Sequence, residues 1–184
     1  MKQKHPHWLK NSLVRVAKIQ LALVVIYVAQ IMAYDAAKLI TPEAVLQRWY
    51  AVAGLTIVSV GVWYLARGKA ATLNHYKLLT WLIILTDIAF AVFNVYTQRG
   101  MSSRSVALFF IPIIISSILL SRVALFTTAI LCVAAYTTTA VAYFVNYFNE
   151  GYKIELYGEI SFYSSLFLLA AALLWVALKS KRHT

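Results

Sequence analysis

Apolar stretches of about 20 residues, separated by short polar segments, recur along the whole chain and constrain its fold more than any other feature. The hydrocarbon core of a bilayer requires about 20 apolar residues per helix, so each stretch is a candidate membrane span. Composition agrees, because 62% of the 184 residues are hydrophobic and 12% are charged, whereas soluble domains carry about 25% charged residues. The sequence therefore predicts an all-α, polytopic integral membrane protein.

We predict a bundle of six transmembrane helices within residues 13–178, preceded by a basic segment (1–12) and followed by a basic tail (179–184). Thr41, Pro42 and Glu43 are typical of an N-cap, a first-turn proline and a first-turn acid, so the second helix is expected to begin before its apolar run. The six spans are expected at about 13–34, 49–66, 78–98, 106–121, 124–148 and 160–178.

Basic residues are distributed unequally between the two sides of this bundle. With a cytoplasmic N-terminus, the outer side holds five of the seventeen Lys and Arg residues, and the excess of Lys and Arg on the inner side sets the orientation. Five of the six acids also fall outside. We therefore expect a protein of the bacterial inner membrane with both termini on its cytoplasmic side. The basic residues expected inside are Lys2, Lys4, Lys10, Arg15, Lys18, Arg67, Lys69, Lys77, Arg122, Lys179, Lys181 and Arg182.

Asp87 is the one acid expected within a span, near the middle of the bilayer. An ionised carboxylate is costly there, so Asp87 must pair, face water or be protonated. Thr80 and Asn94 lie seven residues away on either side, on the same helical face, and this stripe is expected to point into the bundle. This stripe predicts one of two roles. Either it binds a proton, a cation or a ligand, or it forms a hydrogen bond that joins two helices.

Neutral polar residues gather in the outer half of the predicted bundle. Individually, such side chains most often bond neighbouring helices. As a set they favour a polar cavity open to the outside, which we take as the candidate ligand site. The candidate ligand-binding residues are Asp87, Asn94, Gln30, Thr138, Tyr143, Asn146, Ser161 and Ser164.

Pro112 interrupts the fourth span and predicts a kink, because proline removes a backbone donor and clashes with the preceding turn. We treat it as a candidate hinge, with Ser116 and Ser117 able to bond freed carbonyls. In the second span, Gly54 and Gly61 lie on one face and predict a close backbone approach.

Motifs for metal, nucleotide or nucleophilic chemistry are missing from the sequence, so we expect no cofactor, no metal and no enzyme activity within these residues. The four histidines fall at the inner surface or in the tails, which argues against a haem site inside the bundle. Cys132 is the single cysteine, so no intrachain disulfide can form. The basic residues crowd at helix ends, as expected for topology signals and anionic headgroups rather than for nucleic acid.

The stretch from Ile111 to Arg122 combines a proline-bearing span with a short basic turn, and a span rich in Ala, Thr and Tyr follows it. With six spans and both termini inside, this pattern resembles the membrane sensor region of bacterial sensor histidine kinases of the pilus-regulation or redox-regulation type. In that family the last span continues into a cytoplasmic signalling helix and a kinase core. The histidine box and ATP-binding domain are not within these residues, so the resemblance places any kinase activity beyond Thr184.

We therefore expect a membrane-embedded signal-input module, acting as a homodimer, that detects a periplasmic or membrane-borne cue. The cue would pass through the last helix to a cytoplasmic partner in a two-component system. Two alternatives remain open at the level of sequence. One is a small six-helix solute-binding subunit of a transporter, and the other is an assembly subunit of a larger membrane complex.

Overall fold

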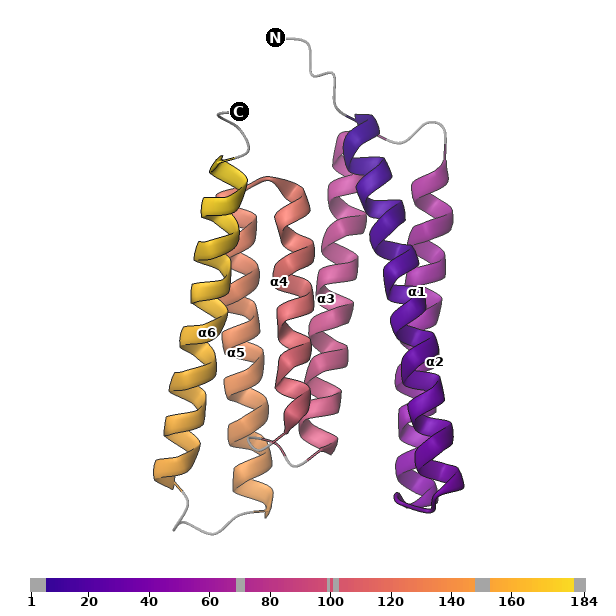
Figure 1. Ribbon diagram of the computed structural model, residues 1–184, viewed down its shortest axis with the longest axis vertical. Helices are drawn as coiled ribbons and strands as arrows, with labels where there is room; N and C mark the ends of the chain where they lie inside the picture. Colours follow the sequence, from indigo (N-terminus) through magenta and orange to yellow (C-terminus); the bar gives the residue numbers. More distant parts are fainter. Residues whose placement is uncertain (1–5, 69–71, 99, 101–102, 148–152, 181–184) are drawn as a thin grey trace. The chain divides into compact units, whose positions relative to one another are not determined.

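The computed structural model of the protein describes residues 6–68, 72–98, 100, 103–147 and 153–180 (Figure 1). Nearly all of these residues are helical and none of them is in a strand, which confirms the expected all-α class. In chain order, with η for 3₁₀ helix, the elements are α1 (Pro6–Ala36), α2 (Pro42–Arg67), α3 (Leu73–Thr97), η2 (Arg104–Phe109), α4 (Phe110–Ser116), η3 (Ser117–Leu119), α5 (Arg122–Tyr147) and α6 (Lys153–Ser180).

Five helices, α1, α2, α3, α5 and α6, are at least 25 residues long and apolar enough to cross a membrane. The fourth apolar segment, Arg104–Leu119, is shorter than these five. Of the two predicted basic segments, residues 1–5 and 181–184 lie outside the described residues. Residues 6–12 form the first turns of α1, and residues 179–180 end α6.

Four helices begin at least five residues earlier than the apolar runs indicated. α1, α2, α3 and α6 start at Pro6, Pro42, Leu73 and Lys153 rather than near residues 13, 49, 78 and 160. The sequence boundaries marked where hydrophobicity begins, whereas polar residues continue a helix readily beyond the hydrocarbon region. The predicted start signal of α2 is confirmed, because Oγ1 of Thr41 accepts a hydrogen bond from the Ala44 backbone N–H at 3.3 Å.

The fourth segment was expected to be one helix over 106–121, and this expectation is wrong. α-Helical geometry is confined to Phe110–Ser116, with 3₁₀ helix before and after it, and Leu120 then ends the segment in a left-handed conformation with φ 49°. Pro112 accounts for the 3₁₀ turns that precede α4, because its ring crowds the carbonyl four residues earlier and it has no N–H to donate. Ser116 and Ser117 do not bond carbonyls freed by the proline; they donate to Ile113 O and Ile114 O.

The chain divides into two compact units, Met1–Ile83 and Ile84–Thr184, with the boundary inside α3. In the first unit, α1 and α2 form an antiparallel hairpin (Figure 1). The buried positions of each helix alternate in steps of three and four residues, the spacing of a coiled-coil seam. They are Leu9, Leu13, Ala17, Gln20, Val24, Tyr27 and Ile31 on α1, and Arg48, Val52, Leu55, Ser59, Val62 and Ala66 on α2.

A polar pair lies in the middle of this hairpin seam. The Ser59 hydroxyl lies 3.3 Å from Gln20 Oε1 and 2.7 Å from the Leu55 carbonyl, and its single proton is shared between these two acceptors. A polar pair among apolar seam positions favours one register of the two helices, because a slip breaks the Ser59–Gln20 contact. Gly54 and Gly61 take no part: nothing lies within 4 Å of a Cβ built at either, so the expected close backbone approach is wrong.

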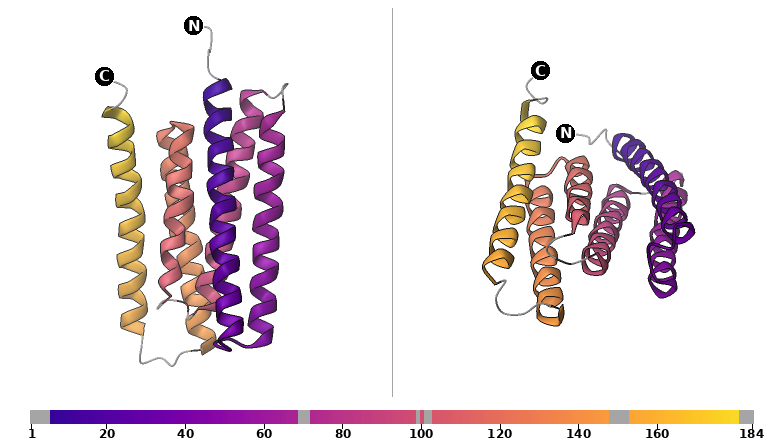
Figure 2. Two further views of the ribbon diagram at one scale, coloured as in Figure 1. Left: turned by 45° about the vertical axis from the view of Figure 1, so that its right-hand side comes forward. Right: turned by 60° about the horizontal axis from the view of Figure 1, so that its bottom comes forward.

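The second unit contains the C-terminal half of α3 with η2, α4, η3, α5 and α6. α5 packs against both α4 and α6 (Figure 2). α5 and α6 run side by side in opposite directions (Figure 1), and Tyr136 on α5 contacts Tyr163 and Phe167 on α6. This unit contains all the candidate site residues except Gln30.

Candidate functional site

The polar stripe on α3 is buried, as expected. Asp87 is 4% exposed, and Thr80 and Asn94 are fully buried. Thr80 Oγ1 donates to the Tyr76 carbonyl at 2.8 Å, and Asn94 Nδ2 donates to the Phe90 carbonyl at 2.8 Å. Both side chains thus satisfy part of their hydrogen-bonding capacity on their own helix.

Asp87 lies near the middle of α3, between apolar residues of that helix. Its carboxylate is close enough to the Cys132 thiol on α5 for the two groups to interact electrostatically. Cys132 Sγ in turn lies 3.6 Å from the Phe109 carbonyl, which it meets as a donor. In a 3₁₀ helix the Phe109 carbonyl would accept a hydrogen bond from the N–H of residue 112, but Pro112 has no N–H. Asp87, Cys132 and the proline segment therefore meet in one region of the second unit.

On the C-terminal side of Asp87, a chain of hydrogen-bonded side chains connects α3 with η2. Asn94 Oδ1 accepts from Gln98 Nε2 at 3.2 Å, and Gln98 Oε1 accepts from the Ser105 hydroxyl at 2.7 Å. Ser103 caps η2 by accepting from the Ser105 N–H at 3.1 Å. Sequence reasoning missed Gln98, Ser103 and Ser105, although Gln98 is one helical turn from Asn94. Asn94 thus serves to fasten η2 to α3.

Three tyrosines cluster at the C-terminal ends of α3 and α5. The ring of Tyr96 lies 5.8 Å from that of Tyr143 and 6.5 Å from that of Tyr147, and Asn146 Nδ2 donates to the Tyr96 hydroxyl at 3.2 Å. Gly100, with φ +59°, lies so close to Tyr143 that an added Cβ would collide with the ring. Tyr143 and Asn146, both predicted as ligand contacts, are therefore engaged in holding α3 and α5 together.

Other predicted residues lie on α1 and α6. Gln30, on α1, is exposed and donates to the Tyr34 hydroxyl of its own helix at 2.9 Å. Ser161 is exposed on α6, and its carbonyl accepts from the Ser165 hydroxyl. Ser164 Oγ is buried and has no hydrogen-bond partner among the described residues.

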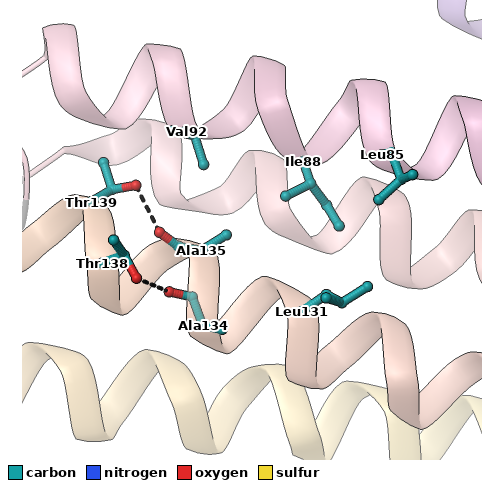
Figure 3. A pocket seen from close by; sticks show the side chains of 8 residues that line it. All are labelled: Leu85, Ile88, Val92, Leu131, Ala134, Ala135, Thr138 and Thr139. Carbon is teal, nitrogen blue, oxygen red and sulfur yellow. Dashed lines mark hydrogen bonds between the residues drawn. The ribbon is translucent and has the colours of Figure 1, made fainter.

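A groove of about 360 Å³ lies between α3 and α5, and it is apolar rather than polar (Figure 3). Thr138 is the one predicted site residue among those that line it. The hydroxyls of Thr138 and Thr139 donate to the carbonyls of Ala134 and Ala135 at 2.8 and 2.7 Å, which removes them as donors to a ligand. The lining residues are Leu85, Ile88, Val92, Leu131, Ala134, Ala135, Thr138 and Thr139. This groove suits an apolar group, in contrast to the polar cavity that the sequence favoured.

An aromatic cluster on the α6-facing side of α5 was not predicted. Tyr136 is fully buried, with its ring 5.4 Å from Tyr163, 6.1 Å from Phe167 and 6.1 Å from Phe109. Phe110 meets Phe167 at 5.2 Å. The Tyr136 hydroxyl has no hydrogen-bond partner among the described residues. The signal in the sequence was aromatic residues on α4, α5 and α6, which without the fold could not be told from an ordinary apolar core.

Among the described residues, no three His, Cys, Asp or Glu side chains come together to hold a metal ion. Comparison with known proteins gives no match to a family model, to a curated protein or to a solved structure. The site therefore has to be interpreted from its own chemistry.

Proposed function

We propose that this chain is the input module of a membrane signalling system. It receives a membrane-borne cue in the groove between α3 and α5, and it passes the cue through α6 to a cytoplasmic output such as a histidine kinase. The membrane is a bacterial cytoplasmic membrane, which the chain crosses six times with both termini inside. The resemblance to the sensor region of histidine kinases, the bias of basic residues and the lengths of the helices support this proposal.

A sixth span requires the short fourth segment to reach across the bilayer. A 3₁₀ helix rises about 2.0 Å per residue, against about 1.5 Å for an α-helix. With six residues in η2, seven in α4 and three in η3, the segment is about 28 Å long. This is close to the hydrocarbon thickness of about 30 Å. The 3₁₀ geometry thus compensates for the small number of residues.

The observation that carries the proposal is the two-sided packing of α5. One side of α5 lines the groove with Ala134, Ala135 and Thr138. The next residue after Ala135 is Tyr136, which packs against Tyr163 and Phe167 of α6. A ligand that shifts or rotates α5 must therefore move Tyr136 against α6. A cue transmits a signal only when it binds two such packings with different affinity.

The proline segment supplies an element with two available geometries. η2 is a six-residue run of 3₁₀ helix, longer than is usual for this geometry. Conversion of η2 to α-helix would shorten it by about 3 Å and rotate its start by about 120° relative to α4. Pro112 is the hinge residue of this proposal because it keeps the preceding turns out of α-helical geometry.

The lining of the groove favours this function over a transporter subunit that captures a water-soluble solute. Such a solute needs polar partners, and the threonine hydroxyls of the groove are bonded to their own helix. An apolar cue dissolved in the bilayer needs no polar partners. A tightly bound water-soluble ligand in the purified protein would support the transport alternative instead.

The test fills the groove with protein atoms in place of the cue. Ala134→Leu adds three carbons inside the groove, and Ala142→Leu makes the same change at an exposed position of α5 outside it. The readout is the labelling rate of a cysteine at Lys179, near the end of α6, in a Cys132→Ser background. We expect Ala134→Leu to change this rate by about fivefold or more, the lower range of allosteric couplings, and Ala142→Leu to leave it unchanged. Equal rates for both variants would remove the groove from the signalling route.

A second test replaces Asp87 and measures the activity of the signalling output. Asp87→Asn keeps the size and hydrogen-bonding ability of the side chain but removes the possibility of a charge. We expect it to insert as well as the parent protein and to alter the output, because ionisable groups inside membranes mark functional sites. The measurements are the amount of protein in the membrane and the activity of the output. An unchanged output would exclude Asp87 from the mechanism.

A further inference from the structure

One end of the α1–α2 hairpin carries basic side chains without any carboxylate near it in the sequence. Residues 6–34 and 44–68 contain no Asp or Glu, and the nearest acids, Asp35 and Glu43, flank the loop at the opposite end. At the basic end, Lys10 near the start of α1 lies beside Arg67 at the end of α2. The charge at this end of the hairpin is therefore not neutralised by side chains of the hairpin.

Lys10 joins the two helices of the hairpin. Its Nζ donates to the Arg67 carbonyl at 3.3 Å and to the Gly68 carbonyl at 3.4 Å. These carbonyls belong to the C-terminal end of α2, where a cation is favoured by the helix dipole. An ammonium group has three donors, so Lys10 retains one for a further acceptor.

Arg67 and Trp63 form the rest of the basic end. The Arg67 guanidinium lies 3.8 Å from the centroid of the Trp63 ring, a stacked cation–π contact. Stacking fixes the plane of the guanidinium while its edge stays available for hydrogen bonds, and Arg67 is exposed. Beneath it, Trp63 Nε1 is buried and has no hydrogen-bond partner among the described residues.

Lys10 and Arg67 thus present donors, while the two carbonyls at this end are already occupied by Lys10. Such a pair requires an acceptor, and a phosphate group provides several oxygen acceptors together with a negative charge. We propose that this end of the hairpin is a binding site for the headgroup of an anionic phospholipid, such as phosphatidylglycerol or cardiolipin. Its phosphate is bound by Arg67 and Lys10, and the Trp63 ring holds the Arg67 guanidinium in place.

The same features argue against a zwitterionic headgroup. Phosphatidylethanolamine brings its own ammonium group beside the phosphate, and the hairpin offers no carboxylate to meet it at this end. They also favour a lipid over free phosphate, because the site lies at the end of two apolar helices long enough to span a membrane. Arg15 and Lys18, both exposed on α1, add to the positive potential around it. In the proposed topology this end of the hairpin faces the inner leaflet. The headgroup site itself does not depend on that topology.

The test measures lipid binding by the full chain with matched variants. Native mass spectrometry of the purified protein, with phosphatidylglycerol and phosphatidylethanolamine in competition, gives the relative occupancy of the two lipids. We expect a preference for phosphatidylglycerol that falls about fivefold in Arg67→Gln, as for the loss of one basic residue at a membrane surface. Arg67→Lys keeps the charge but not the planar fork, so a partial loss is expected. Lys38→Gln removes a charge at the other end of the hairpin and should have no effect.

Trp63→Phe provides a control that does not change charge. It removes the buried N–H but keeps an aromatic ring beneath Arg67, so we expect the preference for phosphatidylglycerol to be retained. An equal fall in Arg67→Gln and Lys38→Gln would overturn the proposal, because binding would then follow net charge alone. A parent protein without lipid preference would overturn it as well. Binding of inorganic phosphate to the detergent-solubilised protein, with no preference among lipids, would assign the site to the free anion.

The leaflet is tested separately from the site. A cysteine at Gly68, in a Cys132→Ser background, should react with a membrane-impermeant thiol reagent only after the cytoplasmic side is opened. If it reacts from the outside while the lipid preference persists, the headgroup site stands and the proposed topology fails. If it is protected and the preference is missing, the topology stands and the headgroup site fails.

Discussion

Tyr136 and Tyr96 are two tyrosines of the second unit that differ in how their hydroxyls are satisfied. Tyr96 accepts from Asn146 Nδ2 at 3.2 Å, whereas Tyr136 has no partner among the described residues and is fully buried. A buried hydroxyl without a partner costs free energy, and its removal leaves an apolar ring that fits the same space. The two residues therefore respond to the same substitution in opposite directions.

We expect Tyr136→Phe to raise the free energy of unfolding by about 1 kcal/mol. Tyr96→Phe loses a hydrogen bond and should lower it by about 0.6 kcal/mol, a typical value for such bonds in membrane proteins. Reversible unfolding in mixed detergent measures both variants. A destabilised Tyr136→Phe would mean that the hydroxyl binds a water molecule or a ligand that this variant cannot retain.

Gly100 lies against Tyr143 at a position that has no room for a side chain. Its φ of +59° is unfavourable for other residues, and a Cβ would strike the ring of Tyr143. We expect Gly100→Ala to lower the free energy of unfolding by about 1–3 kcal/mol. Gly54→Ala is the matched control, since nothing lies within 4 Å of its Cβ and the residue is helical. It should raise stability by about 0.5–1 kcal/mol, and a similar loss in both variants would contradict the account of Gly100.

At the scale of elements, the fourth apolar segment differs most from the other helices. The five long helices have regular α-helical geometry, whereas this segment passes from 3₁₀ to α and back within Arg104–Leu119. Hydrophobicity identified the segment but not its geometry, because an apolar run is compatible with either helix type. Pro112 indicated a disturbance, yet its consequence lies in the turns before it rather than in a simple kink.

Pro112→Ala tests this interpretation. The new N–H can donate to the carbonyl of Leu108, so we expect α-helical geometry to extend into η2 and the segment to shorten by up to about 3 Å. Spin labels at Arg104 and Arg122, in a Cys132→Ser background, report the distance between its ends. Pro42→Ala is the control, because Pro42 is a first-turn residue whose N–H is not needed by the helix. An unchanged distance in Pro112→Ala would show that packing, and not the proline, maintains the 3₁₀ turns.

At the scale of the whole molecule, the number of spans decides how the chain is oriented. With six spans, positions 38 and 104 lie outside and positions 68 and 122 lie inside. If Arg104–Leu119 does not cross the membrane, positions 104 and 122 lie on the same side. Single cysteines at these four positions, in a Cys132→Ser background, should react with an impermeant reagent from outside at 38 and 104 only. Reaction at both 104 and 122, or at neither, would establish five spans.

Several features of this protein could be predicted from its sequence because they depend on local composition. Helical class and long apolar helices follow from runs of apolar residues, and the start of α2 follows from Thr41 and Pro42. The burial of Asp87 and Asn94 follows from helical periodicity along α3. In each case one segment contains all the information, since a helix forms its hydrogen bonds within itself.

The arrangement of the candidate site was decided only by the tertiary structure. The sequence grouped polar residues by depth, but Thr138 bonds its own helix, and Asn94 and Asn146 hold neighbouring elements together. The groove is instead formed by alanines and branched aliphatic residues from two helices, and no single helix contains that pattern. Tyr136 and the Lys10–Arg67–Trp63 group are likewise defined by which helices lie side by side. Apolar and cationic residues carry no local signal of their partners, so their roles follow only from the packing of one helix on another.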